Sequence, residues 1–389
     1  MRLVLRSARL GVSDRIADVA LEGGRVAAIG EPGRIERADR EADLASAVVL
    51  PGLVNAHDHL DFSTFPALGT PPYPSVYAWA RDVDAGFGDP RVKRALAMPL
   101  ADRLFLGGVR NLLAGVSAVA HHGAFHRSLA RDDFPVRVLE RYGFAHSPGL
   151  TPELRKTYRS SDRRIPWLVH AGEGTDPALA AELAALAEAN VLRHNTVIAH
   201  GIAFGAPEIQ RIAEAKACLV WCPESNRHLY GATASPDRYR EQGVRVGLGS
   251  DSPVSGVRDP LSNLACAAAT SGWDAAALFE LASGASAEVA RLPVGGFSVG
   301  APADFLVTRS VEALLRGERL AVGLVIVAGK ARYGEPRWLL SLRVPAAKLE
   351  VDGEPRALAE PVASRAISLL RSGPRLEAAW LQGLRGMRT

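Results

Sequence analysis

Hydrophobic and polar positions in the middle of the chain form short apolar runs that alternate with amphipathic stretches. The apolar runs predict strands within residues 48–60 and at 116–121, 136–143, 167–170, 196–200, 217–222 and 244–248. The amphipathic stretches predict helices at 102–114, 177–189 and 207–215, and Thr175-Asp176-Pro177 is a typical helix start. Strands alternating with helices are typical of a parallel sheet, so we expect an α/β fold of the (β/α)8 type. These runs account for seven strands, and we expect the eighth near residues 144–147.

The two ends of the chain have a different pattern. Short alternating runs at 3–10, 17–21 and 25–29 are separated by glycine-rich turns and predict hairpins, and similar runs return at 296–307 and 324–330. We therefore expect residues 1–50 and 293–340 to form one composite β-sandwich domain, and residues 51–292 to form the barrel. Residues 341–389 are expected to be a partly helical extension without an assigned function.

Residues 60–100 are rich in proline, glycine and aromatic side chains, including Trp79. A long insertion after a barrel strand usually lies over the active-site face, where this one would line or cover the substrate pocket. Packing against the outer helices is the alternative.

Length and composition suit a globular enzyme. A chain of 389 residues accommodates one barrel with an accessory domain, and 48% hydrophobic and 23% charged residues are ordinary values. No apolar run approaches the roughly 18 residues of a membrane span. The first ten residues alternate like a strand and lack the features of a signal peptide, so we expect a cytoplasmic protein.

Charge and cysteine content exclude two other classes. The net charge is +4, but only five of the 46 basic residues are lysine and the basic residues are scattered, so no nucleic-acid partner is expected. Cys218, Cys222 and Cys266 have no paired metal-binding spacing, which argues against a disulfide framework and a thiolate zinc site. We expect a small-molecule substrate and no membrane partner. The sequence is compatible with a homo-oligomer.

Candidate metal ligands lie where the predicted strands end. Successive side chains on a strand point to opposite faces, so His57 and His59 point the same way. An isolated pair of this kind is also compatible with ordinary polar residues leaving a core strand. His170, His200 and Asp251 repeat the pattern at the ends of later strands. Nitrogen and oxygen ligands from several strands, with one open position, are typical of a catalytic zinc or iron site.

Five motifs carry a family resemblance. They are Pro51-Gly52 followed by Asn55-Ala56-His57-Asp58-His59, then His170-Ala171-Gly172-Glu173, Ala199-His200-Gly201, Cys222-Pro223-Glu224-Ser225-Asn226, and Gly247-Leu248-Gly249-Ser250-Asp251. Over residues 1–335 the chain resembles the amidohydrolase superfamily. It is most similar to the branch that contains cytosine, guanine, S-adenosylhomocysteine and aminofutalosine deaminases and the triazine hydrolases.

This resemblance implies a metal site and a proton shuttle. His57, His59, His170 and Asp251 are implied to bind one divalent ion, with zinc favoured over iron or manganese. The ion would supply hydroxide at neutral pH. Asp251 is implied to hold the hydroxide and to accept its proton.

The resemblance also implies two further catalytic roles. His200 would hydrogen-bond the metal-bound water or the substrate, and Glu173 would shuttle protons. A single metal is expected because neither Lys93 nor Lys156 lies in a strand-like run that would offer a bridging ligand.

Substrate contacts are less sharply specified. His146 resembles a fourth-strand histidine that contacts substrate in several deaminases, and Trp79 belongs to the insertion. Asn226 is counted with them as a substrate-binding candidate, and fixing the loop after the seventh strand or a role in a turn are its alternatives. One of His121 and His122 is expected to face the pocket.

The predicted activity is hydrolysis of C–N bonds other than peptide bonds. Deamination of a purine, pyrimidine, triazine or nucleoside-like heterocycle by a metal-bound hydroxide is the leading hypothesis. Hydrolysis of an amide, a cyclic amide or another leaving group is the alternative. A catalytically silent scaffold is disfavoured because the expected ligands are all present. Residues 62–100 contain no clear counterpart of the substrate-clamping acid of some deaminases, which leaves the substrate open.

Overall fold

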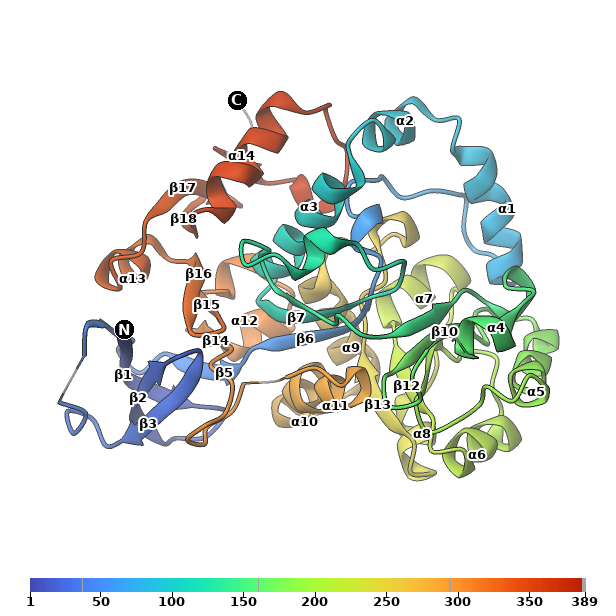
Figure 1. Cartoon of the computed structure of the whole chain (residues 1–389), viewed down its shortest axis with the longest axis horizontal. Coiled ribbons are helices and arrows are strands. Elements are labelled where there is room, and N and C mark those ends of the chain that lie inside the picture. The colour runs from blue at the N-terminus through green and yellow to red at the C-terminus, as the bar shows by residue number, and fades with distance from the viewer. Residues whose placement is uncertain (37, 160, 294, 387–389) are drawn as a thin grey trace.

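The computed structural model describes residues 1–389 except 37, 160, 294 and 387–389. The predicted ranges 1–50, 293–340 and 341–389 each include some of these, which lie outside the described residues. A large sheet built from both ends of the chain lies to one side of the parallel strands and their helices (Figure 1). Within the described residues, no helix is long and apolar enough to cross a bilayer.

The middle of the described chain contains eight strands in two parallel sheets, so the predicted α/β class is confirmed. One sheet contains β6 (Leu53–Asp58), β7 (Val116–His121) and β8 (Arg137–Val138), and the other contains β9 (Gly143–Ala145), β10 (Trp167–Ala171), β11 (Thr196–His200), β12 (Cys218–Trp221) and β13 (Arg245–Leu248). Just beyond β13, Ser250 and Asp251 donate backbone hydrogen bonds of 3.0 Å to the carbonyl of His57. This contact joins the carboxyl ends of β6 and β13.

The region between β7 and β10 differs from the single strand predicted over 136–143. It forms the two short strands β8 and β9, and the exposed Glu140 and Arg141 lie between them. Leu139, between the two strands, is also apolar and buried. Because the apolar run does not stop at the end of β8, its pattern predicts one strand instead of two. The predicted position of an eighth strand, 144–147, overlaps β9. No pairing joins β8 to β9 among the described residues.

Amphipathic helices cover these strands. The three predicted helices correspond to α3 (Leu100–Leu113), to a 3-10 turn over Pro177–Ala180 that continues into α5 (Ala181–Glu188), and to α6 (Ala206–Glu214). The remaining helices of this region are α4 (Leu154–Arg159), α7 (Pro223–Tyr230), α8 (Pro236–Glu241), α9 (Pro260–Ser271), α10 (Ala275–Glu280) and α11 (Ser286–Ala290). Leu183 and Leu186 of α5, and Ile209 and Ile212 of α6, are buried at a spacing of three residues. One apolar face of each helix therefore packs toward the sheet.

Within the described residues, the large sheet has eleven strands from the two ends of the chain. Its order is β19-β17-β18-β16-β15-β14-β5-β1-β2-β3, with β4 paired to β1. The strands are β1 (Arg2–Leu10), β2 (Ile16–Glu22), β3 (Arg25–Gly30), β4 (Arg40–Asp43), β5 (Val48–Pro51), β14 (Phe305–Thr308), β15 (Leu324–Val327), β16 (Lys330–Gly334), β17 (Ala346–Val351), β18 (Glu354–Ala359) and β19 (Leu384–Arg385). The first and last thirds of the chain meet where β5 pairs antiparallel with β14, from Val48 opposite Thr308 to Pro51 opposite Phe305.

The C-terminal residues add both strands and helices. Strands β17, β18 and β19 extend the large sheet, and α13 (Pro336–Ser341) and α14 (Val362–Ser372) pack beside it. The short helix α12 (Val311–Leu315) packs against α9 and α10. Arg365 on α14 donates a hydrogen bond of 3.0 Å to Asp102 on α3. The buried indole of Trp380 donates one of 2.7 Å to the carbonyl of Ser63. The tail is therefore tied to the loop that follows β6.

The insertion after β6 contains α1 (Val76–Gly86) and α2 (Pro90–Leu96). The side chain of Ser75 caps α1. The backbone N–H groups of Tyr73 and Val76 donate to the carbonyls of Leu229, at 2.7 Å, and Glu173, at 2.9 Å. These bonds anchor the insertion on two segments that follow β10 and β12.

Candidate active site

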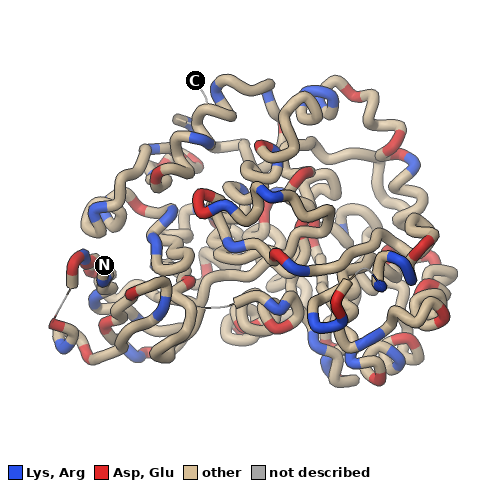
Figure 2. Tube along the Cα trace, in the orientation of Figure 1, with Lys and Arg blue, Asp and Glu red and all other residues tan. Residues whose placement is uncertain are grey.

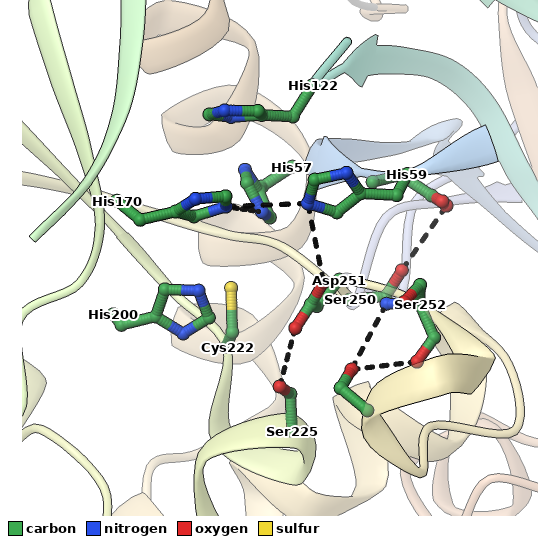
Figure 3. Close-up of polar contacts among 12 residues, drawn as sticks. His57, His59, His122, His170, His200, Cys222, Ser225, Ser250, Asp251 and Ser252 are labelled. Atoms are coloured by element: carbon green, nitrogen blue, oxygen red, sulfur yellow. Dashed lines mark hydrogen bonds and ion pairs between the residues drawn. The ribbon is translucent and has the colours of Figure 1, made fainter. Parts of the chain in front are cut away.

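Three imidazoles converge between the ends of β6 and β10 (Figure 3). His57 lies on β6, His59 follows directly after the last residue of that strand, and His170 lies on β10. The Nε2 atom of His170 lies 3.2 Å from Nε2 of His57 and 3.4 Å from Nε2 of His59. These three residues are called the histidine cluster below. All three are buried.

Burial keeps the histidine cluster neutral. Loss of hydration holds the pKa of His57 and of His170 well below the usual value, and the neighbouring histidines act in the same direction. The same cause lowers the pKa of His59 to about 4, although Asp251 opposes it. A neutral imidazole keeps a nitrogen lone pair available, which is the form that binds a metal ion.

The spacing of the cluster fits a metal ion. Ligands about 2.1 Å from a tetrahedral zinc ion lie roughly 3.4 Å from one another, close to the two Nε2 separations. A carboxylate oxygen that could serve as a further ligand is near, because Oδ1 of Asp251 lies 3.7 Å from Nε2 of His59. The hydroxyl of Ser225 donates to the other oxygen, Oδ2, at 2.6 Å and orients the carboxylate.

His200, at the end of β11, contributes a second kind of nitrogen. Its Nδ1 lies 2.7 Å from the side-chain oxygen of Asn226, which accepts the hydrogen bond, while Nδ2 of Asn226 donates to Thr233 at 3.1 Å. This pairing places the hydrogen on Nδ1 and leaves Nε2 facing the site. Nε2 is buried, has no hydrogen-bond partner among the described residues, and lies 3.7 Å from Oε1 of Glu173.

Asn226 therefore occupies a different position from the one expected of a substrate contact. It is fully buried on α7, lies behind His200, and is not among the residues that line the pocket. The expectation of a direct substrate contact is corrected to a role in holding the His200 ring. The motif around Cys222 marks the residue but not its direction, because that depends on how α7 packs against β11.

Glu173 lies on the turn that follows β10. Gly172 and Gly174 flank it with φ of 62° and 145°, backbone conformations that favour glycine, and they let the chain reverse direction there. The hydroxyl of Tyr230 donates a hydrogen bond of 2.7 Å to Oε1 of Glu173. Among the described residues Oε2 has no hydrogen-bond partner, and Glu173 lines the pocket. One carboxyl oxygen is thus held by the protein and the other is available.

Burial raises the pKa of Glu173 to about 7. The charge of Asp251 acts in the same direction, and His200 and the Tyr230 hydrogen bond oppose it. A cation at the histidine cluster would also oppose it. A carboxyl group that titrates near neutral pH both accepts and donates a proton readily, as an acid–base catalyst requires.

A pocket of about 140 Å3 opens above these groups. Its floor contains His59, His170, His200, Glu173 and Asp251. Trp79 and His146, both predicted to contact the substrate, line its walls. The indole N–H of Trp79 donates to the carbonyl of Leu68 at 3.3 Å, so its ring and not its N–H faces the pocket.

His122 is the member of the His121–His122 pair that faces the site. Its ring stacks on that of His170, with ring centroids 4.1 Å apart and an angle of 16° between the planes. Nε2 of His122 contacts the carbonyl of Ala145 at 3.0 Å. His121 points elsewhere, and its Nδ1 accepts a hydrogen bond of 3.3 Å from the backbone of Leu60. His122, His146 and His170 form a second group of three nearby imidazoles.

A buried charged network lies on the opposite face of β6. Oδ2 of Asp58 accepts hydrogen bonds from Nη2 of Arg110 at 2.6 Å, from Asn111 at 2.8 Å and from Asn55 at 2.9 Å. Ser250 Oγ lies 2.8 Å from the amide nitrogen of Asn55. Asn55, Asp58, Arg110, Asn111 and Ser250 are called the arginine network below. Arg110 and Asn111 are not predicted from the sequence, because nothing in a helical stretch marks a side chain that pairs with a distant strand.

Comparisons with known proteins agree with this geometry. The profile described as "Amidohydrolase family" matches residues 48–332. The chain is 26% identical over 350 residues to a 5-methylthioadenosine/S-adenosylhomocysteine deaminase of Halobacterium salinarum, which covers 76% of this chain and 80% of that protein. It is also 26% identical over 322 residues to the aminodeoxyfutalosine deaminase of Deinococcus radiodurans, covering 64% of this chain and 74% of the relative.

Solved structures share the fold. An adenosine deaminase from Xanthomonas campestris with bound zinc aligns with a TM-score of 0.69 and 18% identity, over 85% of this chain and 92% of that one. Atrazine chlorohydrolase TrzN from Arthrobacter aurescens, complexed with zinc, aligns with a TM-score of 0.66 and 17% identity, over 85% and 94% of the two chains.

Proposed function

The chain belongs to the amidohydrolase family and is a hydrolytic enzyme, and from this premise we propose that it deaminates an aminated heterocycle. The resemblance predicted from the sequence motifs is confirmed by the family match. Two of the relatives are named as deaminases of adenosine derivatives or of aminodeoxyfutalosine, which supports a purine-like substrate.

The observation that carries the proposal is the placement of Glu173. Its carboxyl group lines the same pocket as His59 and His170, lies 3.7 Å from Nε2 of His200, and has a pKa raised to about 7. Hydrolytic deamination needs a group that takes a proton from water and returns it to the ring nitrogen or the leaving amine. A carboxyl group of this kind suits both transfers.

The proposed metal ligands are His57, His59, His170 and Asp251, with zinc as the favoured ion. Three neutral nitrogens and one carboxylate oxygen match the ligand preferences of zinc and of ferrous iron. A divalent ion held there would lower the pKa of a water ligand to about 7. Solved neighbours that contain zinc support the choice of metal.

The proposed roles of the other side chains follow from their free atoms. Oε2 of Glu173 would take a proton from the attacking water and protonate the ring nitrogen next to the amino-bearing carbon. Nε2 of His200, held by Asn226, would orient the water or the developing oxygen. Asp251 would accept the second proton of the water and pass it to the amine, so that ammonia leaves and a C=O bond replaces the C–N bond.

The proposed framework is a distorted (β/α)8 barrel of β6 to β13, with the site at the carboxyl ends of its strands. The Asp58–Asp251 bridge and the barrel-type neighbours support this arrangement. Residues 1–50 and 293–340 are proposed as one composite β domain. The antiparallel pairing of β5 with β14 supports that grouping.

Ammonia release tests the proposal. The purified protein, with its metal content measured, is incubated with aminopurine nucleosides, free aminopurines, cytosine and an aminotriazine, and ammonia and the ultraviolet spectrum of the ring are followed together. Ammonia should appear in step with the spectral change for at least one purine compound, and a chelator should abolish it. Hydrolysis of cyclic amides or amides, with no ammonia from any aminated heterocycle, would instead support the alternative activity.

A further inference from the structure

Resting on the proposed deaminase activity, we infer that the pocket selects substrates whose non-reacting part is uncharged and apolar, and that it discriminates against those bearing a phosphate or a carboxylate. This inference goes beyond the comparisons. The name of the relative, 5-methylthioadenosine/S-adenosylhomocysteine deaminase, does not say how the charge of a substituent affects the activity of this chain.

The upper walls of the pocket are apolar. Their apolar residues are Phe62, Val76, Trp79, Val83, Leu150 and Val254, beside the smaller Ala80, Ser147 and Ser252 and the ring of His146. These residues come from the segment after β6, from α1, from the turn after β9 and from the turn after β13. An alkyl, thioether or similar neutral substituent would lose hydrated apolar surface against them, which favours binding.

The charged groups that line the pocket are acidic. Asp84, which is exposed on α1, lines the pocket together with the buried Glu173 and Asp251. Among the residues that the structure describes, no lysine or arginine side chain lines the pocket. This is a local feature, because Figure 2 shows lysine and arginine spread along the whole chain.

The two arginines of helix α3 are not among the residues that line the pocket, and each contacts another group. Nη1 of Arg103 donates to the carbonyl of Asp61 at 3.1 Å, and Arg110 is paired with Asp58. Four histidines line the pocket, and three of them, His59, His170 and His200, belong to its reactive floor. Among the described residues that line the pocket, none is a fixed cation that could pair with an anionic substituent.

A phosphate or carboxylate in this position would face both apolar walls and the charge of Asp84. It would lose hydration without gaining a counter-charge, and like charges brought together disfavour binding. The positive charge of a divalent ion would be offset in part by Asp251 next to it. The pocket should therefore separate substrates by charge more sharply than by size.

A matched pair of nucleosides tests the inference. We expect kcat/KM for 5'-methylthioadenosine to exceed that for adenosine 5'-monophosphate by about 100-fold or more at low ionic strength, with adenosine between them. Equal values within threefold for the neutral and anionic compounds would overturn the inference while leaving deamination intact.

Charge variants locate the cause. Asp84→Lys should narrow the ratio between the neutral and the phosphorylated nucleoside by about tenfold, because it places a cation where an anion now stands. Asp14→Lys makes the same change in net charge on the exposed β1–β2 connection of the large sheet and should alter the ratio by less than twofold. Equal effects of the two variants would show that overall charge, and not the pocket, sets the preference.

Failure of the inference and failure of the proposed function give different results. If no aminated heterocycle releases ammonia, the proposed function fails and the inference fails with it. If ammonia is released but an anionic substrate is turned over as well as its neutral partner, only the inference is wrong. In that case Asp84→Lys would not change the ratio.

Discussion

Strand β6 carries two buried polar clusters of opposite character on its two faces. On one face, the neutral rings of His57 and His59 meet that of His170. The Nε2 atom of His170 lies 3.2 Å from that of His57 and 3.4 Å from that of His59, so uncharged nitrogens converge. On the other face, Asp58 meets Arg110 in a fully buried ion pair of 2.6 Å. The two clusters are adjacent in sequence but differ in what holds them together.

This difference separates function from stability. The histidine cluster loses hydration on burial and recovers little of it within the protein, so it costs stability until a ligand binds. In the arginine network a single carboxylate oxygen accepts three hydrogen bonds from nitrogen donors of 2.6 to 2.9 Å. Removing one partner of such a pair leaves a buried charge unpaired. We therefore expect substitutions on the first face to abolish activity and those on the second to weaken the fold.

The largest expected effect is that of His57→Ala. Loss of one of three converging nitrogens should remove most of the bound metal and make turnover undetectable, whereas the metal-free protein should unfold at the wild-type denaturant concentration or above it. Elemental analysis and denaturant unfolding in the presence of a chelator measure the two effects. A variant that keeps about one equivalent of metal would show that His57 is not a ligand. A wild-type content near two equivalents would overturn the expectation of a single metal.

Glu173→Gln should lower kcat by about 10⁴-fold while metal is retained, because glutamine keeps the shape of the side chain but does not cycle a proton. Metal content and kcat are measured on the same preparation. Turnover within threefold of the wild type, with the metal in place, would move the proton transfer to His200 or Asp251.

The same variant has a predicted effect on stability. The carboxyl group of Glu173 has a pKa of about 7 in the folded protein and a usual value of 4.5, so the folded state holds more protons between these values. Its contribution favours folding most at low pH and is lost as the pH rises from about 4.5 through 7. Without metal, wild type should lose stability over this range relative to Glu173→Gln. Parallel unfolding curves at pH 5 and pH 8 would contradict this.

Arg110→Met should lower the free energy of unfolding by about 3–5 kcal/mol, because it leaves Asp58 buried without its counter-charge. Arg103→Met on the same helix is the matched control. Arg103 is only partly buried, and the change should lower stability by less than about 1 kcal/mol. Urea unfolding of both variants measures the difference. Similar losses for the two would show that the arginine network does not support β6.

Tyr230→Phe should produce the smallest effect, a change in pH dependence. Burial, Asp251 and Glu182 raise the pKa of Glu173, and His200 lowers it. The hydrogen bond from the Tyr230 hydroxyl stabilises the charged carboxylate and therefore also lowers this pKa. Without that hydroxyl the pKa rises, and the acid limb of the kcat/KM profile should move to higher pH by about 0.5–1 unit.

Tyr158→Phe is the control for this change. The Tyr158 hydroxyl donates to Asn195, which lies outside the pocket, and its loss should leave the profile in place. A shift of the Tyr230→Phe profile to lower pH would contradict the assigned hydrogen bond.

Local pattern in the sequence determined which side chains leave their strands at the site. Strand alternation predicted that His57 and His59 point the same way. Each of the other three residues follows an apolar run: His170 lies next to the last residue of β10, His200 is the last residue of β11, and Asp251 follows the end of β13. The glycines beside Glu173 marked a turn there. The prediction of one strand over 136–143 differs from the structure, because apolar residues continue into the segment that separates β8 from β9.

Pairings across the chain were decided only by the tertiary structure. Arg110 meets Asp58 across 52 residues and Tyr230 meets Glu173 across 57, and neither arginine nor tyrosine carries a local mark of its partner. Asn226 holds His200 because α7 packs beside β11, and β17 to β19 extend the large sheet because β18 finds a partner in β16. The physical reason is that periodicity states which side of an element a residue occupies, whereas the partner on that side depends on how separate elements pack.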